Sequence, residues 1–102
     1  MGKKSRNKGY RGEHNLVSLL RSHKINAIRV PLSGATEFCK GDLIIDGLIA
    51  EVKVRQNGFK ELYKWIENKD LLFVKADRHE YLCIMPLKIF MKLKENNNAR
   101  TV

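Results

Sequence analysis

The sequence predicts a single α/β domain, and two patterns of apolar residues carry this prediction. The first pattern is a hairpin centred on Asp46 and Gly47, because a type I′ turn needs a positive φ at both central residues. Apolar β-forming residues flank this turn on both sides. The second pattern is helical, with apolar residues recurring three and four positions apart. Together the two patterns favour a mixed sheet with helices packed on it.

The first half of the chain reads as a helix followed by three strands. A helix is expected over about residues 12–23, where Leu16, Val17 and Leu20 share one face. A short strand follows at 26–30 and ends before Pro31. The loop after it leads into the two strands of the hairpin.

The second half of the chain reads as a helix, two strands and a last helix. Apolar residues recur at i, i+3, i+4 and i+7 from Phe59 to Ile66, which is typical of an amphipathic helix that Asn68 stops. Strands are expected at 71–76 and 80–85, and Pro86 suits the first turn of a final helix. The predicted order is therefore α-β-β-β-α-β-β-α.

We expect one domain over residues 12–94, because 102 residues suffice for a single core but not for two. A flexible arm is expected at 1–11 and a loose tail at 95–102. The arm contains no acidic residue, and its basic residues are Lys3, Lys4, Arg6, Lys8 and Arg11.

The charge of the chain favours a polyanionic partner. Lys and Arg number 20 against 11 Asp and Glu, a formal net charge of +9. Nucleic acid is the first expectation for such a balance, and an anionic membrane surface is the second. No apolar run approaches the roughly 18 residues of a membrane span, and the basic N-terminus lacks the apolar stretch of a signal peptide. Two cysteines are too few for a disulfide framework, so we expect a reducing, cytoplasmic location.

The hairpin would place two acidic residues face to face. With a two-residue loop, Ile44 pairs with Ile49, and Asp42 falls opposite Glu51. Facing carboxylates destabilise a sheet unless something neutralises them. Lys53 lies two residues beyond Glu51 and hence on the same face, and a hard divalent cation would use the remaining carboxylate oxygens. A longer loop would shift this pairing, and a solvated strand face is the simpler alternative.

Glu13 is a second candidate, because it lies in line with the apolar stripe of the first helix. It precedes Leu16 by three residues and Leu20 by seven. A carboxylate at this position would point toward the sheet. The alternative is that the helix dipole alone favours an acid in a first helical turn.

Four segments of the sequence resemble a known family of nucleases. KGYRGEHNLVSLL, AIRVPLSGA, GDLII and AEVKVR resemble the archaeal-type Holliday junction resolvases of the PD-(D/E)xK superfamily, and small phage and prophage nucleases of that group are similar too. The resemblance covers about residues 8–94, with its specific matches between 8 and 55. It implies a restriction-endonuclease-like core and a metal-dependent endonuclease that cuts four-way DNA junctions in recombination and repair. Gly41 stands in place of the motif's proline, a frequent replacement in the superfamily.

The resemblance also implies roles for individual residues. Asp42 matches the Asp of the signature, Glu51 and Lys53 match its Glu-x-Lys, and Glu13 matches the helix carboxylate. Asp42, Glu51 and the carbonyl of Val52 would hold Mg²⁺ or Mn²⁺, and Glu13 would bind a second ion or its water shell. A water activated by the metal would attack the phosphodiester, with Lys53 orienting it or stabilising charge.

The same resemblance implies contacts with DNA and with a second subunit. Arg29 and Ser33 would grip the phosphate near the cut, with Thr36 as the alternative to Ser33 because the loop is long. The basic arm is expected to contact the DNA backbone independently of sequence. Resolvases of this type are homodimers, and late apolar residues such as Phe73 and Tyr81 would be shared between subunits or form plain core.

Two alternatives to a resolvase remain open at this point. The same site would also serve a nuclease that acts on nicks, flaps, mismatches or plain duplex. A basic DNA-binding module that has lost catalysis is the other alternative. The intact set of Asp42, Glu51 and Lys53 argues against such a loss.

Overall fold

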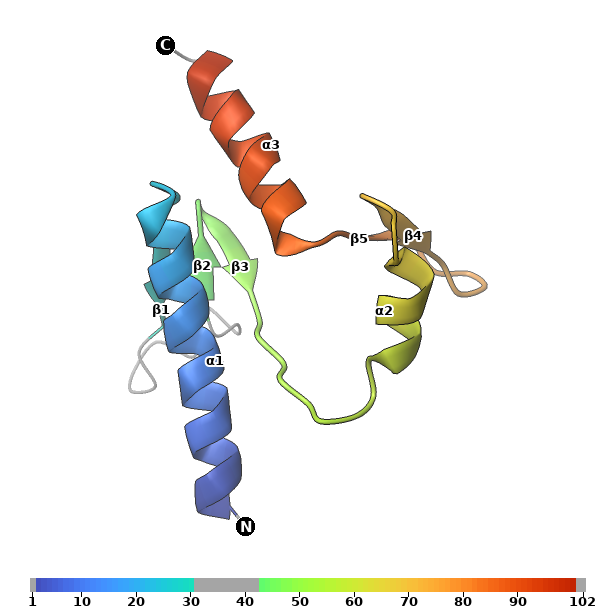
Figure 1. Cartoon of the computed structure of the whole chain (residues 1–102), viewed down its shortest axis with the longest axis horizontal. Coiled ribbons are helices and arrows are strands. Elements are labelled where there is room, and N and C mark those ends of the chain that lie inside the picture. Colours follow the sequence, from blue (N-terminus) through green and yellow to red (C-terminus); the bar gives the residue numbers. More distant parts are fainter. Residues whose placement is uncertain (1, 31–42, 101–102) are drawn as a thin grey trace. The chain divides into compact units, whose positions relative to one another are not determined.

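The computed structural model describes residues 2–30 and 43–100, and the side chains of 11–30 and 43–96. The described residues form a mixed α/β chain in the predicted order of elements (Figure 1). The chain groups into two compact units, Met1–Val54 and Arg55–Val102. The single domain expected over residues 12–94 stays a prediction. Each unit is described below by itself.

Helix α1 covers Gly2–Ser22 and therefore begins earlier than the apolar pattern predicted. The expectation of a flexible arm over 1–11 is corrected for the described residues 2–11, which are helical. The physical reason is that Lys and Arg are good helix formers, and adding residues to an existing helix costs far less than nucleating one. Apolar periodicity detects only the part of a helix that packs, so it missed this polar extension.

The end of α1 is a Schellman motif. The amide of Ile25 donates to the carbonyl of Leu20 (3.0 Å), and the amide of Lys24 donates to the carbonyl of Arg21 (2.9 Å). Lys24 takes the left-handed conformation that this cap requires, with φ 62°. Leu20 and Ile25, the apolar pair that accompanies such a cap, are both buried. The cap turns the chain back toward the sheet.

Strands β1 (Ala27–Arg29), β2 (Leu43–Ile45) and β3 (Leu48–Ala50) form an antiparallel sheet in the order β1-β2-β3. Asp46 and Gly47 have φ values of 50° and 81°, so the predicted turn with two positive φ angles is confirmed. The predicted pairing is confirmed for the described residues. Its members are Ile45 with Leu48, Ile44 with Ile49, and Leu43 with Ala50.

One face of this sheet is covered by α1. Cross-strand partners share a face, so Ile28, Ile44 and Ile49 form an apolar row on the other face. Ile49 is 63% exposed. The buried residues all lie between α1 and the sheet or at the helix end, and they are Val17, Leu20, Ile25, Ala27, Leu43 and Ile45.

The second unit contains two helices and a two-stranded sheet. Helix α2 covers Lys60–Ile66, and β4 (Leu72–Val74) pairs antiparallel with β5 (Leu82–Ile84). The single mixed sheet that the sequence predicted is therefore wrong: the described strands form two separate antiparallel sheets. Pairing between distant strands depends on tertiary packing, which a local pattern does not encode.

Helix α3 covers Leu87–Arg100 and follows Pro86, whose carbonyl accepts from the amide of Ile89 (2.9 Å). The expected loose tail at 95–102 is thereby corrected, because the helix continues to Arg100. Among the described helices, none combines the length and the apolar character that crossing a membrane requires.

No side chain described in the second unit is buried. The apolar stripe of α2, with Phe59 just before it, lines an open hollow together with the end of β5 and the start of α3. Tyr63 on this stripe is 75% exposed, and Phe73 on β4 is 59% exposed. The described apolar side chains of the second unit are therefore half-buried or exposed.

Candidate functional site

The sheet register gathers several of the predicted site residues at one end of the sheet. Arg29, the last residue of β1, pairs with Leu43, the first residue of β2, and Leu43 pairs with Ala50, the last residue of β3. Glu51 follows Ala50 directly, and Asp42 precedes Leu43 directly in the sequence. Arg29 and Glu51 therefore lie at the same end of the sheet. Asp42, Ser33 and Thr36 are outside the described residues.

Glu13 of α1 forms an ion pair with Arg29 of β1. The Nε of Arg29 donates to Oε2 of Glu13 (3.0 Å), and a terminal guanidinium nitrogen lies 2.9 Å from the same oxygen. The Glu13 side chain is 19% exposed and that of Arg29 is 38% exposed. The predicted position of Glu13 on the inward side of α1 is consistent with this contact. The two residues connect the helix to the strand at the end of the sheet where Glu51 lies.

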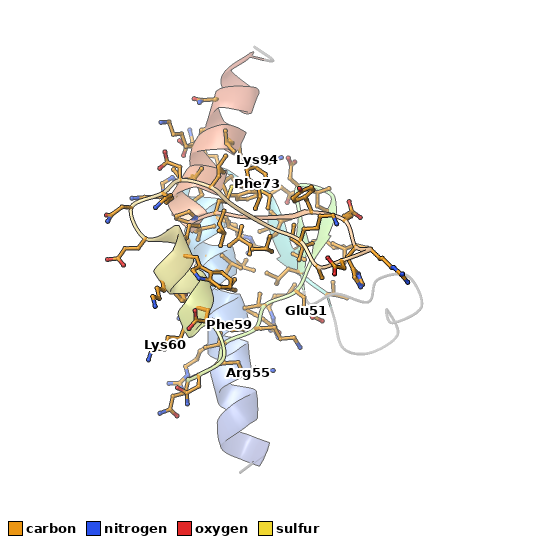
Figure 2. The ribbon with its side chains drawn as sticks, turned by 90° about the vertical axis from the view of Figure 1, so that its right-hand side faces the viewer. Glu51, Arg55, Phe59, Lys60, Phe73 and Lys94 are labelled. Atoms are coloured by element: carbon orange, nitrogen blue, oxygen red, sulfur yellow. The ribbon has the colours of Figure 1, made fainter. Side chains whose placement is uncertain are left out.

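Glu51 and Lys53 form a second ion pair, with Nζ of Lys53 3.7 Å from Oε2 of Glu51. Both side chains are about half exposed, at 53% and 54%. Glu51 lies where the chain leaves β3 (Figure 2). The spacing of two residues brings the carboxylate and the ammonium together, as the period of an extended chain predicts. An exposed pair of this kind contributes little to stability.

The segment that carries Glu51 and Lys53 packs against α1 through the alternate residues Val52 and Val54. A Cβ atom at Gly12 would lie 2.7 Å from Cγ2 of Val54 and 3.7 Å from Cγ1 of Val52. Alternation along the segment then puts Glu51 and Lys53 on the side away from α1. Glu13 and Glu51 therefore reach the same end of the sheet from opposite faces.

The donor chemistry at this end of the sheet fits a hard divalent cation, although the described residues do not complete a site. Carboxylate oxygens are the ligands that Mg²⁺ prefers, and Glu13 and Glu51 supply them. Within residues 2–30 and 43–100, no three His, Cys, Asp or Glu side chains converge as metal ligands would. Asp42, the third acid that the sequence predicts, is outside that range.

The basic residues of the N-terminal segment that are predicted to contact DNA lie on helix α1. Lys3, Lys4, Arg6 and Lys8 belong to α1, and their side chains are not among those described. Arg11 lies farther along the same helix and is exposed. Residues at positions 4, 8 and 11 follow the i, i+4, i+7 spacing that places them on one side of a helix.

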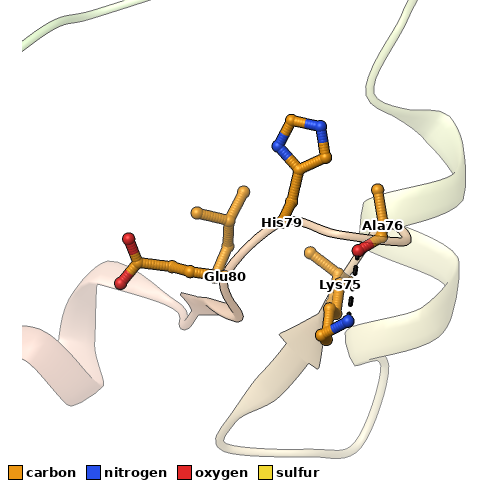
Figure 3. Close-up of a pocket in the computed structure, with 6 residues that line it drawn as sticks. Lys75, Ala76, His79 and Glu80 are labelled. Carbon is orange, nitrogen blue, oxygen red and sulfur yellow. Dashed lines mark hydrogen bonds between the residues drawn. The ribbon is translucent and has the colours of Figure 1, made fainter.

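A hollow at the turn between β4 and β5 does not make a competing site. It is lined in part by Lys75, His79 and Glu80, which are exposed. In Figure 3 the side chains of His79 and Glu80 point in different directions, and Nζ of Lys75 donates to the carbonyl of Ala76 (3.4 Å). These polar groups do not converge on a common point.

Sequence reasoning assigned Glu13 and Arg29 separate roles and missed the contact between them. Nothing in the spacing of the two residues signals it, because the contact depends on how α1 packs against β1. Compared with models of protein families, with curated proteins and with solved structures, the chain finds no match in any of the three.

Proposed function

We propose that this protein is a Mg²⁺- or Mn²⁺-dependent endonuclease that cuts branched DNA, four-way junctions in particular. The observation that supports the proposal best is the register of the first sheet. It puts Glu51 directly after the last pair of the β2–β3 hairpin, opposite the position that Asp42 would take if the pairing continues by one residue. Lys53 lies beside Glu51, with 3.7 Å between Nζ and Oε2, and the two residues have the spacing of the Glu-x-Lys signature. The resemblance to the PD-(D/E)xK nucleases supplies the reaction.

In this proposal each residue has a chemical role. Asp42, Glu51 and the carbonyl of Val52 would hold the ion. The bound ion would lower the pKa of a coordinated water so that hydroxide is available near neutral pH. Lys53 would orient the attacking water or offset the charge that develops on the phosphate. Glu13 would act on the ion or its hydration shell from the side of α1.

The proposed substrate follows from the charge and from the resemblance. A net charge of +9 suits the phosphate backbone of DNA. Arg11 and the four basic residues before it would track that backbone along α1. Ser33, or Thr36 in its place, would contact the phosphate near the cut.

The experiment that tests the proposal compares a labelled four-way junction with a linear duplex of the same sequence. Each DNA substrate is incubated with the wild-type protein in Mg²⁺, with the wild-type protein in EDTA, and with the Asp42→Asn variant in Mg²⁺. Paired symmetric nicks in the junction alone, lost in EDTA and in the variant, are expected. Equal cutting of both substrates would leave a nuclease that is not a resolvase. Tight binding without cutting would leave a DNA-binding module.

We also propose that the active form is a homodimer, because two symmetric strands of a junction must be cut. Exposed apolar side chains such as Ile49, Phe73 and Tyr81 support the expectation of a further interface. Sedimentation at micromolar concentration is expected to give a dimer. A monomer with intact junction cleavage would contradict this part of the proposal.

A further inference from the structure

We infer that Arg29 is a positioning residue for Glu13 rather than a contact to the DNA phosphate. In this arrangement Arg29 holds the carboxylate so that its other oxygen accepts hydrogen bonds from the hydration shell of a divalent cation. The inference rests on the proposed metal-dependent function. It assigns Glu13 an outer-sphere role and gives Arg29 a role that acts through Glu13.

The geometry of the ion pair supports this inference. Both guanidinium contacts go to Oε2 of Glu13, at 3.0 and 2.9 Å. Oε1 accepts no hydrogen bond from any residue that the structure describes. Because one oxygen is held from the side of β1, the carboxylate cannot rotate without breaking two charge-assisted contacts. The two contacts therefore hold Oε2 in place and restrict the directions in which Oε1 can point, and Oε1 remains able to accept.

The position of Glu13 explains why its role would be outer-sphere. Glu13 approaches the end of the sheet from the face that α1 covers, whereas Glu51 lies on the other side of its segment. A carboxylate that approaches from the opposite face is better placed to contact the water shell of an ion held at Glu51 than to bind the ion directly. Mg²⁺ keeps several waters when it binds to a protein, and these waters extend its reach to a more distant carboxylate.

The Arg29→Gln change has two opposite effects on the affinity for a divalent cation: it removes a repelling charge, and it frees the carboxylate of Glu13. Whether the affinity rises or falls therefore shows which effect is larger. Removing a positive charge near a divalent cation strengthens its binding, by about sixfold at a distance of about 8 Å in pure water and by about twofold at physiological salt. Losing the partner that orients a metal-site carboxylate weakens metal binding by about 10- to 100-fold. If Arg29 positions Glu13, the second effect dominates.

The test measures Mn²⁺ binding by electron paramagnetic resonance in the full chain without DNA. The variants are Arg29→Gln, Arg29→Lys, Glu13→Gln and the double variant Glu13→Gln with Arg29→Gln. Arg21→Gln is the matched control, because Nε of Arg21 also connects α1 to β1 through the carbonyl of Ala27 (2.9 Å). DNA binding is measured in EDTA, and thermal unfolding reports whether each variant folds.

We expect Arg29→Gln and Glu13→Gln each to weaken Mn²⁺ binding by about 10-fold or more, with no further loss in the double variant. Arg29→Lys, which keeps the charge but not the fork of donors, is expected to fall between wild type and Arg29→Gln. Arg21→Gln and DNA binding in EDTA stay within about twofold of wild type.

Several results would overturn the inference. If Arg29→Gln binds Mn²⁺ as tightly as wild type or more tightly, the ion pair only connects the helix to the strand. Weaker DNA binding in EDTA by Arg29→Gln would restore Arg29 as a phosphate contact. A wild-type protein that cuts DNA with Mn²⁺ while Arg29→Gln keeps full Mn²⁺ affinity would overturn the inference alone. A wild type that neither binds Mn²⁺ nor cuts DNA would overturn the proposed function as well.

Discussion

The first compact unit has a buried core, whereas the second unit buries none of its described side chains completely. In the first unit, Leu20 and Leu43 are both fully buried between α1 and the sheet. In the second, the stripe of α2 only lines an open hollow, and Phe73 is 59% exposed. The two units are of similar length but differ in how much apolar surface they remove from water.

This difference indicates where the free energy of folding comes from in each unit. Each buried aliphatic side chain contributes about 1.5–3 kcal/mol relative to an exposed one. The first unit has several such side chains, and the ion pairs of the candidate site lie at the edge of that core. Residues 55–96 of the second unit supply no fully buried side chain, so the stability of this unit depends on half-buried contacts or on a surface that covers it.

The largest expected effect is on the core of the first unit. Leu43→Ala removes a fully buried side chain and should lower the free energy of unfolding by about 2–5 kcal/mol. Phe73→Ala in the second unit should cost less than about 1 kcal/mol, because most of that ring is already in water. Urea unfolding followed by circular dichroism measures both. Equal losses for the two variants would mean that Phe73 is covered in solution.

A second prediction compares the charges of the two units. Changing Lys3, Lys4 and Arg6 in α1 to Gln should reduce the slope of log affinity for DNA against log salt by about 2 to 3, because each lost phosphate contact removes about 0.9. The matched variant changes Lys88, Lys92 and Lys94 in α3 to Gln. Fluorescence anisotropy at several salt concentrations measures the slopes. If the α3 variant changes the salt slope more than the α1 variant does, the main DNA contact lies in the second unit.

A third prediction concerns the close approach of α1 to the segment after β3. Gly12→Ala places a Cβ 2.7 Å from Cγ2 of Val54, and such overpacking costs about 1–3 kcal/mol. Alanine regains about 1 kcal/mol of helix propensity, so the net loss should be about 1 kcal/mol. In a Val54→Ala background the same change should instead stabilise by about 1 kcal/mol. Thermal unfolding of the four proteins checks this. Equal effects in both backgrounds would exclude the contact.

The smallest expected effect is at the cap of α1. Lys24 has φ 62°, a conformation that costs a residue with a Cβ about 1–2 kcal/mol. Lys24→Gly removes that cost but adds entropy to the unfolded chain, so a net gain of about 0.5 kcal/mol is expected. Lys24→Ala serves as the control and should not stabilise. A destabilised Lys24→Gly protein would contradict the cap as described.

Features that depend on local backbone chemistry were predictable from the sequence. The Asp46-Gly47 turn and the pairing of Ile44 with Ile49 were predictable because they depend on local backbone chemistry. The closeness of Glu51 and Lys53 was predictable for the same reason, from the period of an extended chain. The helical state of residues 2–11 was not, because that segment lacks the apolar period that marks a packed helix.

Features that depend on tertiary packing could not be read from the sequence. The division of the strands into two sheets depends on pairings between distant segments, and the contact between Glu13 and Arg29 depends on how α1 lies on β1. The sequence did identify both residues as candidates. It could not indicate that they bind each other.

Junction cleavage by Glu51→Gln tests whether Glu51 belongs to a nuclease active site. The Glu51 side chain is about half exposed and its pair with Lys53 is weak, so the free energy of unfolding of the variant should lie within about 0.5 kcal/mol of the wild-type value. It should bind a four-way junction in EDTA as wild type does, yet lose cleavage in Mg²⁺. Glu61→Gln, an exposed acid on α2, is the control and should cut normally. Junction cleavage that survives in Glu51→Gln would contradict a metal-dependent nuclease at this end of the sheet.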